Sequence, residues 1–467
     1  MQMNVFNSLT RRNEPLVPAA DNTVRMYTCG PTVYNFAHIG NFRAYTFEDI
    51  LRRVIQFNGY GVKQVMNLTD VDDKTIRGAN AAAVKLTDYT RTYKDAFFAD
   101  LKALNVQPAE IYPAATDHIP EMIALVEKLV AKGVAYQAPD GSVYFSVRKF
   151  PGYGKLAHID FDHQQTGARC AADEYDKENV GDFALWKAWE ESDGPVGWDS
   201  PWGRGRPGWH IECSAMSMKY LGESFDLHTG GIDNLFPHHE NEIAQAEAAT
   251  GREFVKTWMH CAHLRVNGEK MSKSLGNFFT LRDLVGKGWS GREIRYVLIN
   301  AHYRSGLNFA FTALEDARKS LARIDACVDA LEKAQAAGTD AADAPDWAQK
   351  CLDDFTAAVN DDLNIPRAFA ALFELVRQSN AVVSRPEPVP AARILDVFRR
   401  MDTVLGVIFF GKAGKTEVPA EIQALLDSRA AARAAKNWAE SDRLRDEIAA
   451  AGWLVKDSRE GQSVTKK

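Results

Sequence analysis

The stretch 269–277 (EKMSKSLGN) concentrates groups that can bind phosphate. Lys270 and Lys273 supply compact positive charge. Ser272, Ser274 and the exposed N–H groups of a glycine-containing turn supply hydrogen-bond donors. Taken alone, such a cluster is more often a solvated basic turn. The loop therefore predicts a phosphate contact only if a second nucleotide-binding stretch exists elsewhere in the chain.

That second stretch is His38-Ile39-Gly40-Asn41. A strand-prone run precedes it at 23–29, an amphipathic run follows at 42–57, and residues 62–68 have strand character again. This order predicts a βαβ unit in which His38 and Asn41 stand at a helix N-terminus. Unpaired N–H groups and the helix dipole favour an anion there, at the edge of a parallel sheet where nucleotides bind. A capping or core role for His38 is the alternative.

A third group of residues has the chemistry of metal ligands. His238 and Glu242 lie four residues apart on one face of a predicted helix that begins at Pro237, whereas His239 is expected to point elsewhere. Cys29, at the end of the first strand, and Cys213 complete a set of sulfur, nitrogen and oxygen donors that suits Zn²⁺. The alternatives are a contact on the helix surface and a closed structural metal site.

Composition limits the class of protein. The chain has 467 residues, of which 46% are hydrophobic, and its net charge is −6, so a nucleic-acid partner requires local basic surface. No apolar run approaches bilayer length and residues 1–12 lack a signal segment, so we expect a cytoplasmic protein without a membrane partner. Six scattered cysteines are expected to be reduced thiols unless they bind a metal.

The elements that must position these motifs follow from periodicity. Residues 114–200 resemble an insertion, with a helix at 119–133, a strand at 141–147 and no catalytic constellation. Its three histidines, His118, His158 and His163, are expected at the surface. Beyond the lysine loop, helical spacing predicts a bundle with helices at 311–331, 348–377 and 389–408.

The last segment carries a basic helix at 422–450, with Arg429, Arg433 and Arg443 and an exposed Trp438, followed by a strand at 453–457. A basic helix with an aromatic side chain is suited to reading single-stranded bases, although a solvated charged helix has the same composition.

Several of these motifs resemble known families. His38 to Asn41 resembles the first signature of class I aminoacyl-tRNA synthetases, and Lys270 to Ser274 matches the second in full. The stretches 29–34 (CGPTVY), 209–213 (WHIEC) and 237–242 (PHHENE) match the cysteinyl-tRNA synthetase family, and the likeness extends to about residue 460. Asn41 replaces the histidine that ends the first signature, which implies a modest effect on nucleotide affinity.

The resemblance implies an α/β fold: a Rossmann-like parallel-sheet catalytic domain with an inserted connective domain, then an α-helical bundle and a small C-terminal domain. The implied domains are the first catalytic half (1–113), the connective insertion (114–200), the second catalytic half (201–282), a stem-contact region (283–310), the bundle (311–410) and an anticodon-binding domain (416–467). A monomer is expected.

The resemblance also implies the sites. The ATP-binding residues would be His38, Gly40, Asn41, Lys270, Met271, Lys273 and Ser274. Among these, the catalytic residues would be His38, Asn41, Lys270 and Lys273, with Mg²⁺ accompanying the nucleotide. L-cysteine would bind Thr69, Trp209, His228 and Asp233. One Zn²⁺ would be bound by Cys29, Cys213, His238 and Glu242 and would take the substrate sulfur as a further ligand. The anticodon of tRNA(Cys) would contact Arg433, Trp438, Asp442 and Asp457.

Three functions compete at this stage. The first is a cysteine–tRNA ligase. The second is the related ligase of mycothiol biosynthesis, which passes cysteine to an amino-sugar and shares the zinc and nucleotide sites. The third is a nucleotide-binding protein that contacts RNA without catalysis. The basic C-terminal segment favours tRNA, because a small-molecule acceptor does not need it.

Overall fold

The computed structural model describes residues 2–159, 181–271, 276–336, 345–384, 388–410, 419–435, 437–458 and 461–466. The chain forms two compact units, Met1–Ile408 and Phe409–Lys467.

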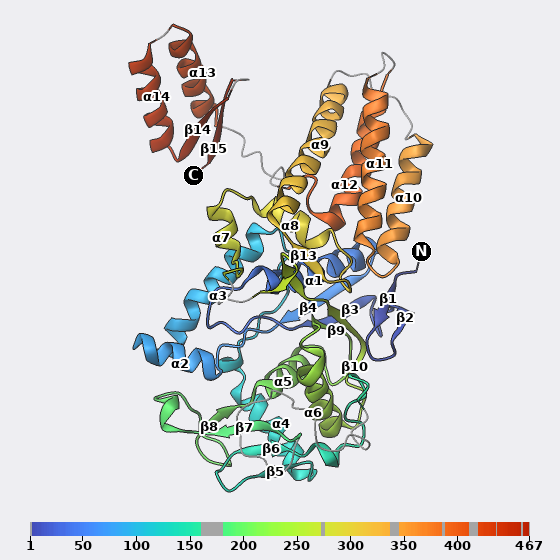
Figure 1. Ribbon diagram of the computed structural model, residues 1–467, viewed down its shortest axis with the longest axis vertical. Helices are drawn as coiled ribbons and strands as arrows, with labels where there is room; N and C mark the ends of the chain where they lie inside the picture. The colour runs from blue at the N-terminus through green and yellow to red at the C-terminus, as the bar shows by residue number, and fades with distance from the viewer. Residues whose placement is uncertain are drawn as a thin grey trace. The chain divides into compact units, whose positions relative to one another are not determined.

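Four parallel strands form the centre of the larger unit (Figure 1). They run in the order β10-β9-β3-β4 and comprise β3 (Thr23–Thr28), β4 (Gly61–Met66), β9 (Phe225–Gly231) and β10 (Val255–Cys261). Most of their residues are buried, as expected for a parallel sheet covered on both faces. Because β3 pairs with β9, the two distant halves of the chain meet in the middle of the sheet.

Helices cover the two faces of this sheet. Helix α1 (Ile39–Phe57) connects β3 to β4 and lies on one side, whereas α5 (Trp209–Leu221) and α6 (Glu240–Thr250) lie on the other (Figure 1). The inward side chains of α1 recur at helical spacing and include Ile39, Phe42, Ile50, Leu51, Val54 and Ile55. The predicted α/β fold with a Rossmann-like sheet is confirmed.

The segment between the two halves adds its own elements. Helices α2 (Asp73–Ala82), α3 (Leu86–Ala103) and α4 (Ile119–Ala131) come first. An antiparallel sheet follows, formed by β5 (Ala135–Gln137), β6 (Val143–Phe145), β7 (Phe183–Ala188) and β8 (Gly205–Pro207). This sheet and α4 share one hydrophobic core with α5, α6 and β9, so the insertion packs onto the central parallel sheet.

The expectation that the histidines of this segment lie at the surface is wrong for His118. Its side chain is buried, and both ring nitrogens have polar partners there. Nδ1 lies 2.7 Å from the Ala114 carbonyl oxygen and Nε2 lies 2.8 Å from the Tyr220 hydroxyl. His158 is exposed as predicted, and His163 lies outside the described residues.

The remaining elements of the larger unit surround the sheet. The strands are β1 (Asn4–Asn7), β2 (Arg12–Pro15), β11 (Leu264–Val266), β12 (Glu269–Lys270) and β13 (Leu307–Phe309). The helices are α7 (Leu281–Gly286), α8 (Gly291–Ile299), α9 (Phe311–Ala336), α10 (Asp346–Asn360), α11 (Ile365–Val383) and α12 (Ala391–Leu405).

The single helix predicted at 348–377 is in fact two helices. Asp362 and Leu363 adopt positive φ angles between α10 and α11, which ends the first helix. The Asn364 side chain then caps α11 by accepting a hydrogen bond from the Arg367 N–H at 3.2 Å, and Pro366 occupies its first turn. The apolar spacing continues across the break, so periodicity alone did not reveal it.

The smaller unit also departs from its prediction. The predicted helix at 422–450 is divided into α13 (Ala420–Ala434) and α14 (Trp438–Ala450), and β14 (Trp453–Ser458) pairs with a second strand, β15 (Gly461–Lys466). Ile422, Leu426, Ile448 and Trp453 form a core of its own.

No helix among the described residues of either unit is long and apolar enough to cross a membrane.

A buried ion pair ties α1 to α8. The Asp49 carboxylate accepts hydrogen bonds from Arg295 at 2.6 Å and Arg53 at 2.8 Å, and its other oxygen accepts the Gln107 N–H at 2.8 Å. The side chains of Asp49 and Arg295 have no exposed surface. Burial would raise the pKa of Asp49, but the two guanidinium groups and the N–H group outweigh it and lower that pKa.

We expect Asp49→Asn to destabilise the larger unit by about 3–5 kcal/mol at neutral pH, because it leaves the buried Arg295 charge uncompensated. The lowered pKa means that the ionised carboxyl stabilises the fold above its ordinary pKa. This stabilisation is lost as pH falls through the lowered value, so the difference between wild type and variant should shrink in acid.

Urea titrations followed by tryptophan fluorescence at several pH values measure this difference. The matched control is Asp316→Asn, which removes an exposed ion pair with Lys319 and should cost less than about 1 kcal/mol. Equal destabilisation by the two variants would contradict the prediction.

Candidate active site

The four predicted metal-ligand residues lie close together at the carboxyl end of β3 in the central sheet. The ligand atoms of Cys29, Cys213, His238 and Glu242 lie within 4.8 Å of one another, and all four residues are buried. Cys29 directly follows β3 and Cys213 lies in α5. His238, in the helical turn just before α6, and Glu242, in the first turn of α6, face each other, with 3.1 Å between Nε2 and Oε1. The pairing of β3 with β9 therefore joins donors from both halves of the chain.

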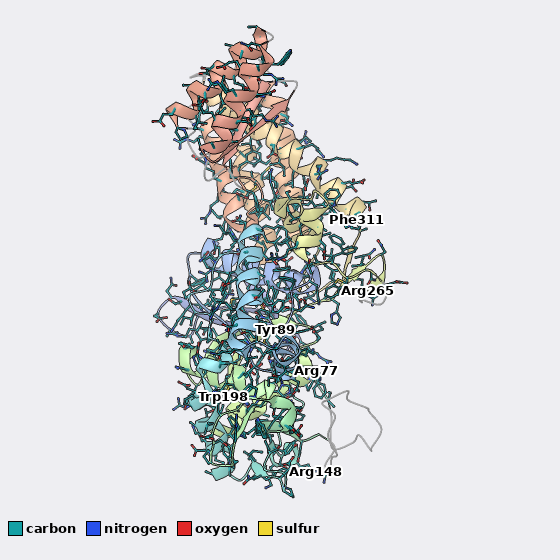
Figure 2. All side chains as sticks on the ribbon, turned by 90° about the vertical axis from the view of Figure 1, so that its left-hand side faces the viewer. Arg77, Tyr89, Arg148, Trp198, Arg265 and Phe311 are labelled. Carbon is teal, nitrogen blue, oxygen red and sulfur yellow. The ribbon has the colours of Figure 1, made fainter. Side chains whose placement is uncertain are left out.

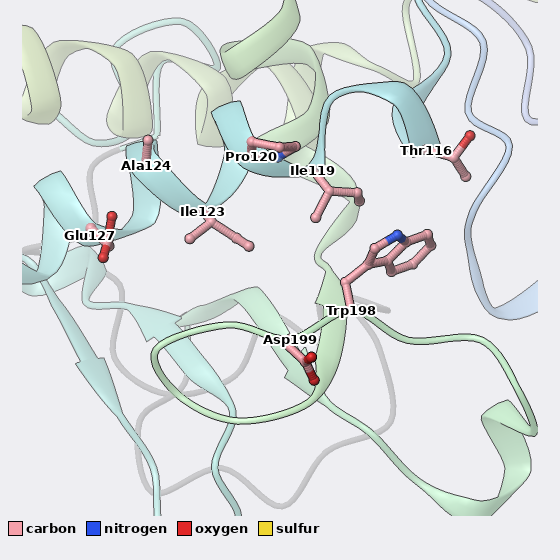
Figure 3. Close-up of a pocket in the computed structure, with 8 residues that line it drawn as sticks. All are labelled: Thr116, Ile119, Pro120, Ile123, Ala124, Glu127, Trp198 and Asp199. Atoms are coloured by element: carbon pink, nitrogen blue, oxygen red, sulfur yellow. The ribbon is translucent and has the colours of Figure 1, made fainter.

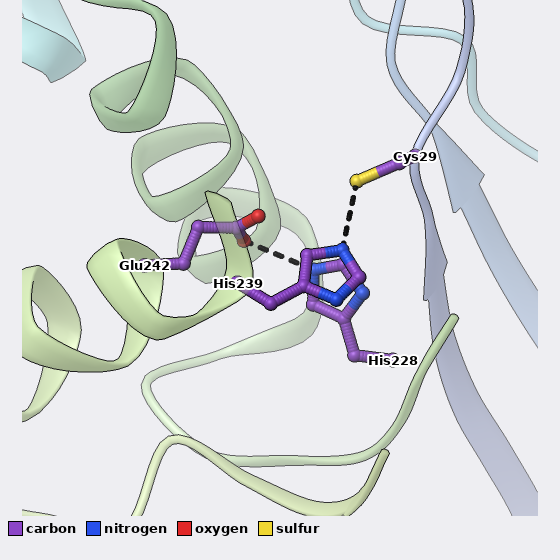
Figure 4. Close-up of side chains that lie close together, drawn as sticks. All are labelled: Cys29, His228, His239 and Glu242. Atoms are coloured by element: carbon purple, nitrogen blue, oxygen red, sulfur yellow. Dashed lines mark hydrogen bonds and ion pairs between the residues drawn. The ribbon is translucent and has the colours of Figure 1, made fainter. Parts of the chain in front are cut away.

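A second group shares two of these ligands. Cys29, His228, His239 and Glu242 also offer atoms within 4.8 Å of one another (Figure 4). His239 does not point away from the cluster as predicted: its Nε2 lies 3.3 Å from the Cys29 sulfur. His228 Nε2 lies 2.9 Å from the second oxygen of Glu242. Nothing in the spacing pointed to His239, because the side chains of two adjacent helical residues diverge by about 100°.

The surrounding contacts distinguish the two groups. Nδ1 of His239 lies 2.9 Å from Nε2 of His260. The other ring nitrogen of His260, Nδ1, lies 2.7 Å from the Ser8 hydroxyl. Burial, together with neighbouring histidines, lowers the pKa of His239 and lowers that of His260 to about 3, so both rings are neutral. His239 thus belongs to a hydrogen-bonded chain, and the group with two cysteines is the softer donor set.

The electrostatics of the two-cysteine group favour a bound cation. Burial alone would raise the pKa of Glu242, but His228 and His238 lower it to about 2, so Glu242 is anionic. Burial opposes protonation of His238, yet Cys213 and Glu242 raise its pKa to about 10. Burial raises the pKa of Cys29, and the contact with Cys29 raises that of Cys213. Without a metal, a proton on His238 supplies the positive charge that this group needs.

His210 is a further residue that the sequence did not single out. Its Nδ1 lies 2.9 Å from Nδ1 of His238, which leaves His238 Nε2 for the cluster. Burial and the neighbouring His238 lower the pKa of His210, so this ring is neutral. The adjacent Trp209 ring lies 4.3 Å from the His238 ring and is 45% exposed, so it closes the cluster on the solvent side.

The other residues predicted to bind L-cysteine differ in how far they are buried. Thr69 is buried and its hydroxyl donates to Glu212 at 2.8 Å. His228 has no exposed surface and contacts Glu242, so it lies behind the ligand cluster. Asp233 is exposed on the turn after β9, and its charge acts on His38. Thr69 also pairs through its backbone with Thr32 in the loop that leads to α1.

The predicted nucleotide signature forms the N-terminus of α1. His38 Nδ1 accepts the Asn41 N–H at 3.3 Å, and the Asn41 side-chain oxygen accepts the His38 N–H at 3.1 Å. This reciprocal capping orients both side chains at the positive end of the helix dipole. Burial lowers the pKa of His38, although Asp233 opposes the change, so the ring is neutral near pH 7.

Residues that flank the lysine loop pack against this signature. A Cβ atom on Gly40 would lie 2.9 Å from the terminal methyl of Met271 and 2.9 Å from the His38 ring, so any larger residue would have to displace these two side chains. The Ile39 N–H donates to the Phe279 carbonyl at 3.0 Å, and the His38 and Phe278 rings are 5.0 Å apart. Lys273 and Ser274 lie outside the described residues, as does the side chain of Lys270.

A separate pocket of about 450 Å³ opens on the insertion (Figure 3). Ile119, Ile123 and Trp198 form its apolar wall, and Glu127 and Asp199 stand at its edge. None of the predicted site residues lines it.

The smaller unit carries the predicted anticodon residues. The Arg433 guanidinium lies 5.9 Å from the centre of the Trp438 ring, and Trp438 is 59% exposed. Asp442 is exposed on the next turn of α14, whereas the side chain of Asp457 lies outside the described residues. Two of the basic side chains that the sequence analysis placed on this segment are not free on its surface. Arg429 is buried against Gln462, and Arg443 pairs with Glu440 and Glu447.

Comparisons with known proteins agree with this architecture. Residues 15–319 match the family described as "tRNA synthetases class I (C) catalytic domain". Residues 354–410 match the "DALR domain", and residues 415–464 match the "Cysteinyl-tRNA ligase anticodon binding domain".

Similar proteins cover the whole chain. The "Cysteine–tRNA ligase" of Protochlamydia amoebophila is 50% identical over 99% of this chain and 98% of its own length. The "Cysteine–tRNA ligase" of Chlamydia felis is 48% identical over 99% of this chain and 97% of its own length. Among solved structures, methionyl-tRNA synthetase of Mycobacterium tuberculosis in complex with methionyl-adenylate has a similar fold. The two structures match with a TM-score of 0.58 and a sequence identity of 14%. The match covers 83% of this chain and 90% of the methionyl-tRNA synthetase chain. The chain therefore belongs to the cysteinyl-tRNA synthetase family of class I aminoacyl-tRNA synthetases.

Proposed function

We propose that this protein is a cysteine–tRNA ligase that activates L-cysteine with ATP and transfers it to the 3′ end of tRNA(Cys). The observation that carries the proposal is the position of the buried Cys29, Cys213, His238 and Glu242 cluster. It lies at the end of the strand whose following loop leads to the nucleotide signature. The relatives named cysteine–tRNA ligase support the same reaction.

Zn²⁺ fits this cluster. Two thiols, one imidazole and one carboxylate form a donor set of borderline softness, and the anionic Glu242 and the high pKa of His238 show a local demand for positive charge. When bound, Zn²⁺ supplies a thiophilic centre that favours the sulfur of cysteine over the hydroxyl of serine. Cys29, Cys213, His238 and Glu242 would hold it, and Trp209 would limit access from solvent.

The first reaction is adenylate formation. The cysteine carboxylate attacks the α-phosphorus of ATP, the bond to the β-phosphate breaks, and pyrophosphate leaves. Mg²⁺ would accompany the nucleotide and offset charge on its phosphates. We assign the phosphate contacts to His38, Gly40 and Asn41 at the α1 N-terminus and to Lys270, Met271, Lys273 and Ser274 of the lysine loop. The barrier falls through positioning and charge stabilisation, so no side chain becomes a covalent nucleophile. Thr69, His228 and Asp233 orient the amino acid, directly or through Glu212 and Glu242.

The second reaction transfers the cysteinyl group. A terminal ribose hydroxyl of the tRNA attacks the adenylate carbonyl, the ester forms, and AMP leaves. We assign recognition of the anticodon to Arg433, Trp438, Asp442 and Asp457 in the smaller unit, which bears an exposed ring suited to base stacking. We assign activation to 1–113 and 201–282, place the enzyme in the cytoplasm and expect it to act as a monomer.

Lys273→Ala should slow adenylate formation by about 100-fold or more, because it removes a cation that stabilises charge on the leaving phosphates. The affinity for cysteine should change far less, since we assign the amino-acid contacts to Thr69, Trp209, His228 and Asp233 and not to the lysine loop. Pre-steady-state adenylate formation and cysteine titration measure the two quantities. Lys287→Ala, an exposed lysine beyond α7, serves as the control. An equal loss of affinity and rate would overturn the assignment of Lys273.

Cysteine transfer assayed with tRNA(Cys) and with an amino-sugar acceptor side by side tests the whole proposal. We expect cysteine-dependent ATP–pyrophosphate exchange and charging of the tRNA alone. Failure to charge tRNA would refute the proposed function, and absence of exchange would leave only an RNA-binding protein.

X-ray absorption at the zinc edge tests the role of the metal. The metal should gain one sulfur neighbour when L-cysteine is added and none when L-serine is added. An unchanged shell with cysteine would mean that the metal is structural.

A further inference from the structure

Four aromatic side chains lie together outside the buried core, beside the candidate active site. Tyr34 and Phe36 come from the loop before α1 and are each 36% exposed, whereas Tyr89 and Tyr93 come from α3 and are half-buried. The rings of Phe36 and Tyr93 are 5.3 Å apart, and those of Tyr89 and Tyr93 are 5.2 Å apart, both edge to face. We call these four residues the ring surface.

Cations border the ring surface. Lys74 Nζ, on α2, lies 5.1 Å from the centre of the Tyr34 ring, and the Arg282 guanidinium, on α7, lies 4.9 Å from that of Phe36. Arg77 is exposed one helical turn beyond Lys74, and Figure 2 shows it on the same face of the molecule as Tyr89. Within the described part of the chain, Lys74 and Arg77 form no ion pair, so both can meet a ligand.

The acidic residues of these helices are mostly engaged elsewhere. Asp73 pairs with Lys187 at 3.0 Å and with Arg206. Asp72 caps α2 by accepting the Thr75 N–H at 2.7 Å. The carboxylate of Asp88 pairs with Arg91 at 3.4 Å. The Asp72 carboxylate, which also experiences the Lys74 charge, is therefore the one among these three acidic groups that faces a cation beside the ring surface.

The loop that carries Tyr34 and Phe36 connects the metal-ligand cluster to the nucleotide signature. Its loop begins after Cys29 and ends at His38, so it lies between the ligand cluster and the nucleotide signature. The Tyr89 hydroxyl donates to the Tyr34 carbonyl at 2.9 Å, which fastens the loop to α3. The Val33 N–H donates to the Thr69 carbonyl at 3.0 Å, which fastens it to the predicted amino-acid pocket.

We propose that the ring surface, with Lys74 and Arg77, binds the single-stranded 3′ end of the tRNA and guides it to the adenylate. This inference rests on the proposed function. Unpaired bases stack on aromatic rings without regard to sequence, and cations beside the rings meet the phosphates between them. A duplex has no free base faces to offer these rings.

Binding of two RNAs tests the inference directly. The probes are a tRNA(Cys) transcript with its full 3′ end and the same transcript without its unpaired 3′ nucleotides. Wild type should bind the intact transcript more tightly, and Phe36→Leu or the double variant Lys74→Ala/Arg77→Ala should lose most of that difference. Charging by these variants should fall about 10-fold more than their cysteine-dependent exchange.

Two matched controls keep the test specific. Phe98→Leu changes an aromatic ring of α3 that is 37% exposed but packs on Tyr112 and not on the ring surface. Arg91→Ala removes a cation that is two residues from both Tyr89 and Tyr93 and therefore lies on another side of α3. Both should behave as wild type. The inference is overturned if the variants keep the full preference for the intact transcript, or if exchange falls as far as charging. Failure of wild type to charge tRNA would instead refute the proposed function.

Discussion

Cys213→Ser should abolish tight metal binding and cysteine-dependent ATP–pyrophosphate exchange together. Cys213 supplies one of two sulfur donors in a buried group that also contains Cys29, His238 and Glu242. A serine hydroxyl is a harder and weaker ligand for Zn²⁺ than a thiolate. Since changes to residues that only support metal ligands already cost about 10–100-fold in affinity or activity, loss of a ligand should cost about 100-fold or more.

Metal content after dialysis against a chelator, and exchange at saturating cysteine, measure the two effects. Cys351→Ser is the matched control, because Cys351 is an equally buried thiol in α10 of the helical bundle. It should retain one zinc per chain and full exchange. If Cys213→Ser also kept one tightly bound zinc, the alternative group with His228 and His239 would be the true ligand set.

Removing all residues after Lys412 should leave exchange intact and reduce tRNA charging by about 100-fold or more. The ligand cluster and the nucleotide signature lie in the larger unit, whereas the exposed Trp438 lies in the smaller one, which has its own core. Each base stacked on an aromatic ring contributes roughly 1–3 kcal/mol to binding, so loss of an anticodon contact acts on tRNA and not on cysteine or ATP.

Parallel measurement of exchange and charging distinguishes this outcome from misfolding. Trp438→Ala in the full chain is the finer test and should reduce charging alone, by a smaller factor. The prediction fails if truncation lowers exchange and charging to the same extent, because that would place the smaller unit in the activation step.

The central part of the site could be predicted from the sequence because its donors are chemically distinctive. Two cysteines, a His-Glu pair at helical spacing and a strand-turn-helix signature each restrict the structure locally, and a parallel sheet brings strand ends to one edge. The contacts of His210, His239 and His260 could not be predicted in this way. These contacts depend on how α5, the turn before α6 and β10 pack together, and no spacing along the chain encodes that packing.

Other errors arose where periodicity continues through a change of structure. The apolar pattern crosses the break between α10 and α11, and only Asn364 and Pro366 mark the new helix start. In the smaller unit, Arg429 has the sequence character of a surface cation but is buried beside Gln462 of β15, a strand that was not predicted. Charge composition therefore overestimated the basic surface of this unit.

The pairing of β3 with β9 also has a consequence for synthesis of the protein. During translation Cys29 emerges long before Cys213, His238 and Glu242, and β3 lacks its partner until β9 has been made. Contacts so distant along the chain form late, because the intervening residues must first be ordered. A nascent chain should therefore acquire its metal only after about half of the protein has left the ribosome, and zinc should accelerate a late folding step rather than collapse of the N-terminal half.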